Sequence, residues 1–200
     1  WKQANKIVMV GYNRRYAPMT QKIIESLANR KQPLIAIYRV NAEHVPQDHW
    51  IYEPEEGGGR LISEACHFID YIQYVAHSPI VKISTQTIES TSIQDKLDNF
   101  ITTITLQDGS IGTVIYTSQG NKTIPKEYLE VHTENSTTTL NNNRKLKISK
   151  NSKKTKTKTY LTQEKGHKNE LKLFIESVYK GMNLEEEFKF AVLSTLATLK

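Results

Sequence analysis

The chain has 200 residues, of which 38% are hydrophobic and 24% charged, enough for one ordinary core, or for one domain and part of another. No window approaches about 18 consecutive apolar residues, so no membrane span is expected. A single cysteine, Cys66, excludes an intrachain disulfide and a multi-cysteine metal site, and favours a reducing, cytoplasmic compartment.

The two ends of the sequence resemble internal positions of a longer protein. Residue 1 is Trp1, with no initiator Met and no signal-peptide pattern after it. The start therefore looks like a cut inside a longer chain. The sequence stops at Lys200 within a helical pattern, so the end is open to the same interpretation.

The first part of the chain alternates between strands and helices. Residues 6–12 are apolar and rich in β-formers, and predict a buried strand. Helical spacing predicts a helix over 18–30, and residues 34–40 predict a second strand. A long irregular connection follows over 41–58, and loops of this length in compact domains are more often functional than idle. A glycine triplet then opens a helix across about 60–76.

From residue 80 onward the pattern changes to strands, and then returns to helices. The expected strands are 80–89, 99–106, 111–118, 127–133, 137–140, 144–148 and 155–161. Helices over 167–180 and 188–200 close the chain. Strands grouped apart from helices indicate an α+β fold, a sheet covered on one face by helices. The uncovered face would need a partner.

The net charge of +6 comes from one segment. Residues 144–158 hold eight of the 27 basic residues and no acid, which leaves 19 basic against 21 acidic residues elsewhere. A basic nucleic-acid-binding domain is one interpretation. Lysines that alternate with Thr, Leu and Ile, without aromatic residues before Tyr160, instead favour a solvated edge strand that resists aggregation.

The block from Glu55 to Asp70 carries the strongest chemical signal. Gly57-Gly58-Gly59 lets the backbone approach a ligand closely and opens a helix, whose free N–H groups favour a polar group or an anion. His67 follows one to two turns later among apolar neighbours, and can move a proton near neutral pH. The block therefore predicts one wall of a small-molecule site.

Cys66 stands beside His67, which raises the possibility of a Cys/His nucleophile. Adjacent helical positions point about 100° apart and do not face each other. A small buried apolar residue is the favoured interpretation of Cys66.

Four segments in this order resemble one family over roughly residues 6–200. They are Val10 to Pro18 (Val-Gly-Tyr-Asn-Arg-Arg-Tyr-Ala-Pro), Gly57 to Asp70, Asp98-Asn99-Phe100, and Asp108-Gly109-Ser110-Ile111-Gly112. Together they resemble the C-terminal half of the glucose–fructose oxidoreductase/inositol dehydrogenase (Gfo/Idh/MocA) family. The nearest likeness is to sugar oxidoreductases found with surface-polysaccharide pathways.

The resemblance implies a two-part NAD- or NADP-dependent enzyme of which this chain is the second part. The family's dinucleotide fingerprint, Gly-x-Gly-x-x-Gly, is absent from the sequence, so no cofactor is expected to bind this chain alone. Residues 1–12 would be the remnant of the Rossmann domain, including its last strand, and 13–200 the substrate-binding and oligomerisation domain. That domain would be an open, mostly antiparallel, glyceraldehyde-3-phosphate-dehydrogenase-like sheet whose exposed face pairs with another subunit.

The resemblance also implies which residue accepts the proton when hydride leaves a sugar or nucleotide-sugar hydroxyl. His67 matches the family histidine, and Ser63 stands where the family has an aspartate. Glu64 lies three residues before His67, within reach of its face, and could supply the missing carboxylate. Ser63 and Glu64 remain alternatives for orienting His67, and a core histidine without a catalytic role is the competing interpretation.

Other candidate substrate contacts come from segments before and after the block. Asn13 and Arg14 follow the first strand and are expected to face the site, while Arg15 is expected to be structural or salt-bridged. Gly58 and Gly59 are expected to approach the substrate with their backbone. Trp50 and Tyr52 would either stack on a sugar ring or bury the long loop, and Lys122 follows a strand and could reach the substrate.

One further alternative stays open, and one kind of site is excluded. Ser63 at the aspartate position would also suit a non-catalytic relative that serves as a scaffold or subunit. His44 and His49 do not predict a metal site, because no third ligand has suitable spacing.

Overall fold

A computed structural model describes residues 6–199, and the described strands form one eight-stranded sheet in the order β2-β3-β4-β1-β5-β6-β7-β8. Neighbouring strands are antiparallel except β1 and β4, which are parallel. The strands are β1 (Ile35–Asn41), β2 (Ile80–Thr87), β3 (Phe100–Leu106), β4 (Ile111–Thr117), β5 (Glu127–Thr133), β6 (Ser136–Asn141), β7 (Lys145–Lys150) and β8 (Lys156–Thr159).

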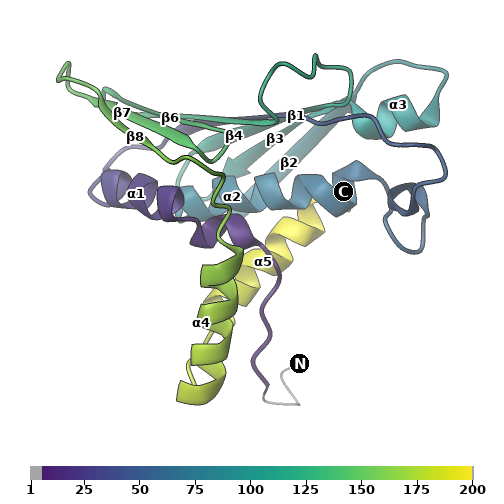
Figure 1. Cartoon of the computed structure of the whole chain (residues 1–200). Helices are drawn as coiled ribbons and strands as arrows, with labels where there is room; N and C mark the ends of the chain where they lie inside the picture. The colour runs from purple at the N-terminus through teal and green to yellow at the C-terminus, as the bar shows by residue number, and fades with distance from the viewer. Residues whose placement is uncertain (1–5, 200) are drawn as a thin grey trace.

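The longer helices lie on one side of this sheet, and one short helix lies at the end of the strands (Figure 1). They are α1 (Pro18–Leu27), α2 (Cys66–Ala76), α3 (Ile93–Asp98), α4 (His167–Lys180) and α5 (Glu185–Ala197). Figure 1 shows α4 projecting away from the sheet, on the same side as the first described residues, 6–12. The predicted α+β sheet, covered on one face by helices, is confirmed. No helix among residues 6–199 is both long enough and apolar enough to cross a membrane.

Alternation along the central strands divides the sheet into a core face and an open face. In β1, Ala36, Tyr38 and Val40 are buried, because every second side chain points toward the helices. The residues between them point the other way, and Ile35 and Ile37 are 54% and 36% exposed. β4, which lies beside β1, adds the exposed Ile111, and β3, which lies beside β4, adds the exposed Ile101.

Helix α2 packs closely on the centre of the sheet. Phe68, Ile69 and Ile72 are buried, as their helical spacing predicts. A Cβ on Gly112 of β4 would lie 2.5 Å from Cγ2 of Ile72, so only glycine allows this approach. This packing fixes the position of His67, which is carried by the same helix.

The N-terminal strand prediction is wrong for the described part of the chain. Residues 6–12 form no strand here, because β-formers need a neighbouring strand for their N–H and C=O groups, and no strand of the sheet lies beside them. Val10 instead packs with Tyr12 and Ala191 of α5. Residues 1–5 and 200, including both chain ends, lie outside the described residues, so the division at residue 12 stays a prediction.

Two local elements also differ from the predictions. The expected helix over 60–76 begins with a π-helical turn, Leu61–Ala65, before α2 continues it. Helix α3 was not predicted; Ser92 caps it by accepting a hydrogen bond from the Asp95 backbone N–H at 3.2 Å. Because π turns are wider than α turns, residues before Ala65 are rotated relative to those after it.

A buried ion pair between Arg15 and Asp70 joins α2 to the segment before α1, and further hydrogen bonds join both to α5. Arg15 donates two hydrogen bonds to the carboxylate of Asp70, and both side chains are at most 3% exposed. Arg15 also donates to the carbonyl of Glu187, and Ser194 of α5 donates to Asp70 at 3.0 Å. The expectation of a structural, salt-bridged Arg15 is therefore confirmed.

Candidate functional site

His67 lies on α2 with an unpartnered ring nitrogen. Its Nδ1 is buried and has no hydrogen-bond partner among the described residues. The ring of Tyr12 meets the imidazole edge-on, with ring centroids 5.3 Å apart. Burial, and next the positive charge of Arg14, lower the pKa of His67 to about 4. The negative charges of Glu64 and Glu127 act in the opposite direction but raise the pKa by less. His67 is therefore neutral at pH 7, the form that can accept a proton.

Arg14 is held next to His67 by a buried carboxylate that the sequence did not single out. Glu127, at the start of β5, accepts hydrogen bonds from Nε and Nη2 of Arg14 at 3.0 and 2.7 Å. The guanidinium also lies over the ring of Phe68, 4.7 Å from its centroid. The expectation that Arg14 faces the substrate stays a prediction, and two of its donor nitrogens are already used by Glu127.

Glu127 is the centre of a polar network. It also accepts hydrogen bonds from the Tyr38 hydroxyl and the Asn143 amide, both at 2.8 Å, and pairs with Lys165 at 2.9 Å. Burial alone would raise the pKa of Glu127, but its hydrogen bonds and ion pairs with Arg14 and Lys165 outweigh burial and leave the pKa far below its ordinary value. Its position as the first residue of an alternating strand would place it in the core, the one sequence signal that could have revealed it.

Neither alternative for orienting His67 forms a hydrogen bond with it. The Ser63 hydroxyl donates to the carbonyl of Gly59 at 2.8 Å. The Glu64 carboxylate accepts from the Tyr116 hydroxyl and pairs with Arg60 and Lys126 at 3.4 and 3.5 Å. The expectation that one of them orients the imidazole assumed α-helical geometry, and the π turn over 61–65 removes that geometry.

The backbone N–H groups of the glycine triplet form hydrogen bonds within the preceding loop and are not free to bind a ligand. The N–H groups of Gly57 and Gly58 donate to the carbonyl of Glu53, and that of Gly59 donates to the carbonyl of Ile51. Gly58 and Gly59 have φ values of 63° and 88°, and a Cβ on Gly57 would lie 2.4 Å from the Ile51 backbone. The N–H groups of the glycines themselves are therefore occupied, and the expected contact of Gly58 and Gly59 with substrate lacks its backbone donors.

A cavity of about 340 Å³ lies beside the π turn and brings two of the predicted residues together. Glu64 and Lys122 line it, with Lys126, Arg60 and Asn41. Asn41 donates to the carbonyls of Asn121 and Ile124, while its buried Oδ1 has no partner among residues 6–199. The cavity is thus lined by a side-chain amide, a carboxylate and ammonium groups, the kinds of group that hydrogen-bond a polar ligand.

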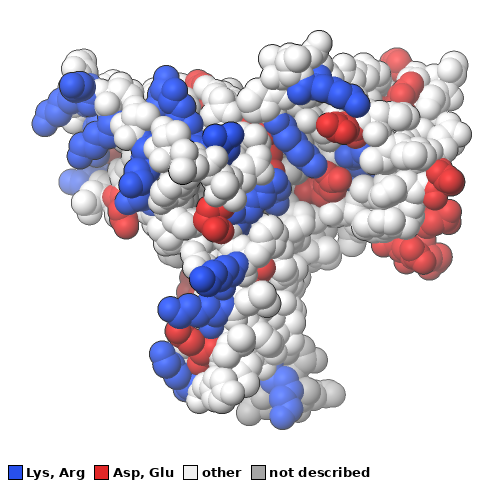
Figure 2. Space-filling model, in the orientation of Figure 1, with Lys and Arg blue, Asp and Glu red and all other residues white. Residues whose placement is uncertain are grey.

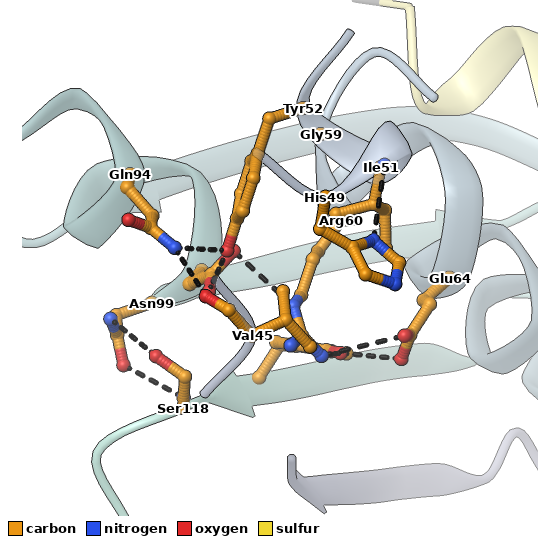
Figure 3. Close-up of polar contacts among 12 residues, drawn as sticks. Val45, His49, Ile51, Tyr52, Gly59, Arg60, Glu64, Gln94, Asn99 and Ser118 are labelled. Atoms are coloured by element: carbon orange, nitrogen blue, oxygen red, sulfur yellow. Dashed lines mark hydrogen bonds and ion pairs between the residues drawn. The ribbon is translucent and has the colours of Figure 1, made fainter. Parts of the chain in front are cut away.

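The long loop before the glycines is tied to α3 and to the π turn (Figure 3). Tyr52 donates to Asp98 at 2.6 Å, and Gln94 donates to the Tyr52 hydroxyl at 2.8 Å. Arg60 reaches back to the carbonyl of Glu43 at 2.6 Å and, as Figure 3 shows, points toward Glu64. Tyr52 therefore secures the loop, one of its two expected roles, whereas Trp50 is 53% exposed.

Asn13 and Cys66 have structural surroundings. The Asn13 side chain is buried and donates to the carbonyl of Lys165 at 2.7 Å, so it holds the segment before α4 instead of facing an open site. Burial raises the pKa of the Cys66 thiol to about 11, which suits the buried apolar residue and not a nucleophile.

Comparison with known protein families identifies the domain. Residues 34–138, from β1 to within β6, match the model of the GFO/IDH/MocA C-terminal domain. The chain belongs to this family. The resemblance seen in the sequence is therefore confirmed. No curated protein matches the sequence significantly.

Solved structures of GFO/IDH/MocA relatives share the fold at low sequence identity. Levoglucosan dehydrogenase, solved with NADH and levoglucosan, is 18% identical with a TM-score of 0.77, covering 98% of this chain and 63% of that one. UDP-N-acetylglucosamine 3-dehydrogenase from Acidithiobacillus ferrooxidans is 13% identical with a TM-score of 0.74, covering 99% and 60%. Aldose-aldose oxidoreductase from Caulobacter crescentus, solved with glycerol, is 11% identical with a TM-score of 0.76, covering 91% and 56%. The chain spans less than two thirds of each of these structures.

Proposed function

We propose that this chain is the substrate-binding C-terminal domain of an NAD(P)-dependent oxidoreductase that acts on a sugar or nucleotide-sugar hydroxyl in the cytoplasm. The observation that carries the proposal is the unpartnered, buried Nδ1 of His67, on the helix that continues from the π turn beside the cavity. The names of the relatives, a levoglucosan dehydrogenase and a UDP-N-acetylglucosamine dehydrogenase, support this substrate class. The proposed setting is surface-polysaccharide metabolism.

The chain's own residues would bind the sugar and take its proton. Asn41 Oδ1 and Lys122 would receive and donate hydrogen bonds at sugar hydroxyls, and the Glu64 carboxylate would accept another. The imidazole of His67 would accept the hydroxyl proton as the carbon loses hydride. Arg14, held by Glu127, would keep that imidazole neutral beforehand. The nicotinamide supplies the hydride acceptor when it is bound.

The nicotinamide cofactor would be held by a separate upstream domain. The glycine N–H groups at 57–59 are used by the chain's own loop, so they offer no dinucleotide cradle. Helix α4 leaves an apolar stripe uncovered, with Leu171, Ile175 and Val178 between 52% and 61% exposed at helical spacing. Because α4 and the first described residues, 6–12, project from the sheet on the same side, an upstream domain that covers the stripe is part of the proposal (Figure 1).

A titration with NAD and NADP tests whether the cofactor site lies outside this chain. We expect the 200-residue chain to show no binding by calorimetry at micromolar to millimolar cofactor, and the full-length protein to bind one of the two. Micromolar binding by the 200-residue chain alone would overturn the proposal, because this chain would then contain the cofactor site.

We also propose that the open sheet face pairs with a second copy of the chain. The four exposed isoleucines, Ile35, Ile37, Ile101 and Ile111, lie on three adjacent strands there. Light scattering is expected to show self-association, and Ile37→Lys with Ile101→Lys should shift the protein toward monomer. A strict monomer at high concentration of the unsubstituted protein would contradict this pairing.

A non-catalytic subunit is the second candidate. Ser63 replaces the family aspartate, and its hydroxyl bonds to Gly59 instead of His67. A full-length protein that binds sugars but oxidises none of them would favour this candidate.

A further inference from the structure

A basic groove separates helix α1 from the β7–β8 hairpin, at the β8 end of the sheet. The groove has a volume of about 680 Å³ and is lined by Lys22, Lys150, Lys153, Lys154, Lys156 and Lys158. Figure 2 shows Lys and Arg gathered over this end of the molecule, and Asp and Glu gathered at the opposite end. The β7–β8 hairpin follows residues 34–138, so it lies outside the part of the chain that matches the family model.

The charge of the groove is uncompensated. Glu25 is the single acid among its lining residues, and none of the six lysines forms an ion pair within residues 6–199. Leu146 and Ile148 form an apolar floor between the lysines. The groove therefore favours a ligand that is acidic and also has apolar or aliphatic parts.

Strand β8 presents an open hydrogen-bonding edge beside this groove. It is the last strand of the sheet, pairs only with β7, and is exposed along its whole length. The Tyr160 N–H, just after β8, donates to the Arg144 carbonyl on the β7 side at 2.8 Å. Because the hydrogen-bonding direction alternates along an antiparallel strand, Thr157 and Thr159 turn their N–H and C=O groups outward.

We propose that an acidic, extended segment of a partner protein adds to the β8 edge as a further strand. Lys156 and Lys158 pair across the ladder with Ile148 and Leu146, so they share the face that forms the groove. An added strand with Asp or Glu at every second position would set carboxylates beside these ammonium groups. A second copy of the same edge would meet like charges and be repelled, so the partner must be acidic.

Nucleic acid fits this groove less well. Proteins that bind single strands stack bases on aromatic side chains, and no aromatic residue lines the groove. The inference goes beyond the proposed oxidoreductase function and does not depend on it, because none of the groove residues lines the cavity beside Glu64.

Fluorescence anisotropy with a labelled decapeptide of alternating Glu and Thr tests the proposal on the full 200-residue chain. We expect saturable binding that weakens at least about tenfold in Lys156→Glu/Lys158→Glu. Lys172→Glu/Lys180→Glu changes the same charge on exposed α4 and should leave binding within about twofold. Amide exchange of Thr157 and Thr159 should slow when the peptide is bound.

Two further probes separate strand addition from simple charge attraction. A peptide of the same sequence, N-methylated at alternate residues, keeps its charge but cannot form the ladder, and should bind at least about tenfold more weakly. Equal binding of this peptide, unchanged exchange at Thr157 and Thr159, or no binding of the parent peptide would overturn the proposal. Tighter binding of an oligothymidylate with the same number of charges would overturn it in favour of nucleic acid. Lys156→Gln/Lys158→Gln repeats the test without reversing charge.

Discussion

Replacing His67 with Asn in the full-length protein is expected to lower turnover about 10²-fold or more, the usual scale for losing an acid–base group. Asparagine keeps a polar side chain but cannot accept the proton of the sugar hydroxyl. Steady-state assays should show the loss mainly in kcat, since the sugar contacts proposed at Asn41 and Lys122 remain in place.

A matched control for His67 lies on the same helix. His77 ends α2 in the left-handed conformation with φ 49°, is exposed, and tolerates asparagine there. His77→Asn should therefore keep turnover within about twofold. The melting temperature of His67→Asn should be measured beside its turnover, because the substitution removes the edge-on contact with the Tyr12 ring, and a loss of folded protein has to be separated from a loss of catalysis. Unchanged turnover in His67→Asn would remove His67 from the mechanism.

Replacing Glu127 with Gln is expected to destabilise the domain by about 3–5 kcal/mol, the usual cost of removing one partner from a buried ion pair. Glu127 is 1% exposed, and the substitution leaves Arg14 and Lys165 without their carboxylate. Urea unfolding followed by circular dichroism would measure the loss. Glu130→Gln serves as the control on the same strand: its side chain is 31% exposed and pairs with His132, so we expect a loss below about 1 kcal/mol.

The pH dependence of stability provides a second measurement for Glu127. Its pKa in the folded state lies below the ordinary value of 4.5, so its stabilisation is complete above that value and is lost as the pH falls toward the folded pKa. The stability difference between the unsubstituted protein and Glu127→Gln should therefore be constant from about pH 7 to pH 5 and shrink in more acidic solution. A difference below about 1 kcal/mol at pH 7 would contradict a stabilising role for the network.

The fold could be predicted largely because its strands and helices follow simple periodicities. β1 and β4 alternate between buried and exposed residues, and α2 repeats apolar residues at helical spacing, so their positions follow from the sequence. Residues 6–12 have the same β-rich composition, but composition cannot show that no strand lies beside them. Helix α3 was missed because it is six residues long, too short for periodicity to be informative.

The site was predicted less completely, because its contacts depend on the third dimension. His67 could be singled out from its own segment, whereas Glu127 reaches Arg14 from a position 113 residues later. Ser63 and Glu64 were assigned to His67 by helical spacing, and the π turn changes that spacing. The glycine triplet predicts a close backbone approach to a ligand, but the glycine N–H groups donate to the carbonyls of Ile51 and Glu53.

The most direct measurement of the central claim is nicotinamide reduction, followed at 340 nm, with the full-length protein and the 200-residue chain against a panel of sugars and nucleotide sugars. The account predicts turnover of at least one sugar hydroxyl by the full-length protein, a large loss in His67→Asn, and none by the 200-residue chain alone. Turnover by the 200-residue chain, or a full-length protein that binds these sugars and oxidises none of them, would contradict it.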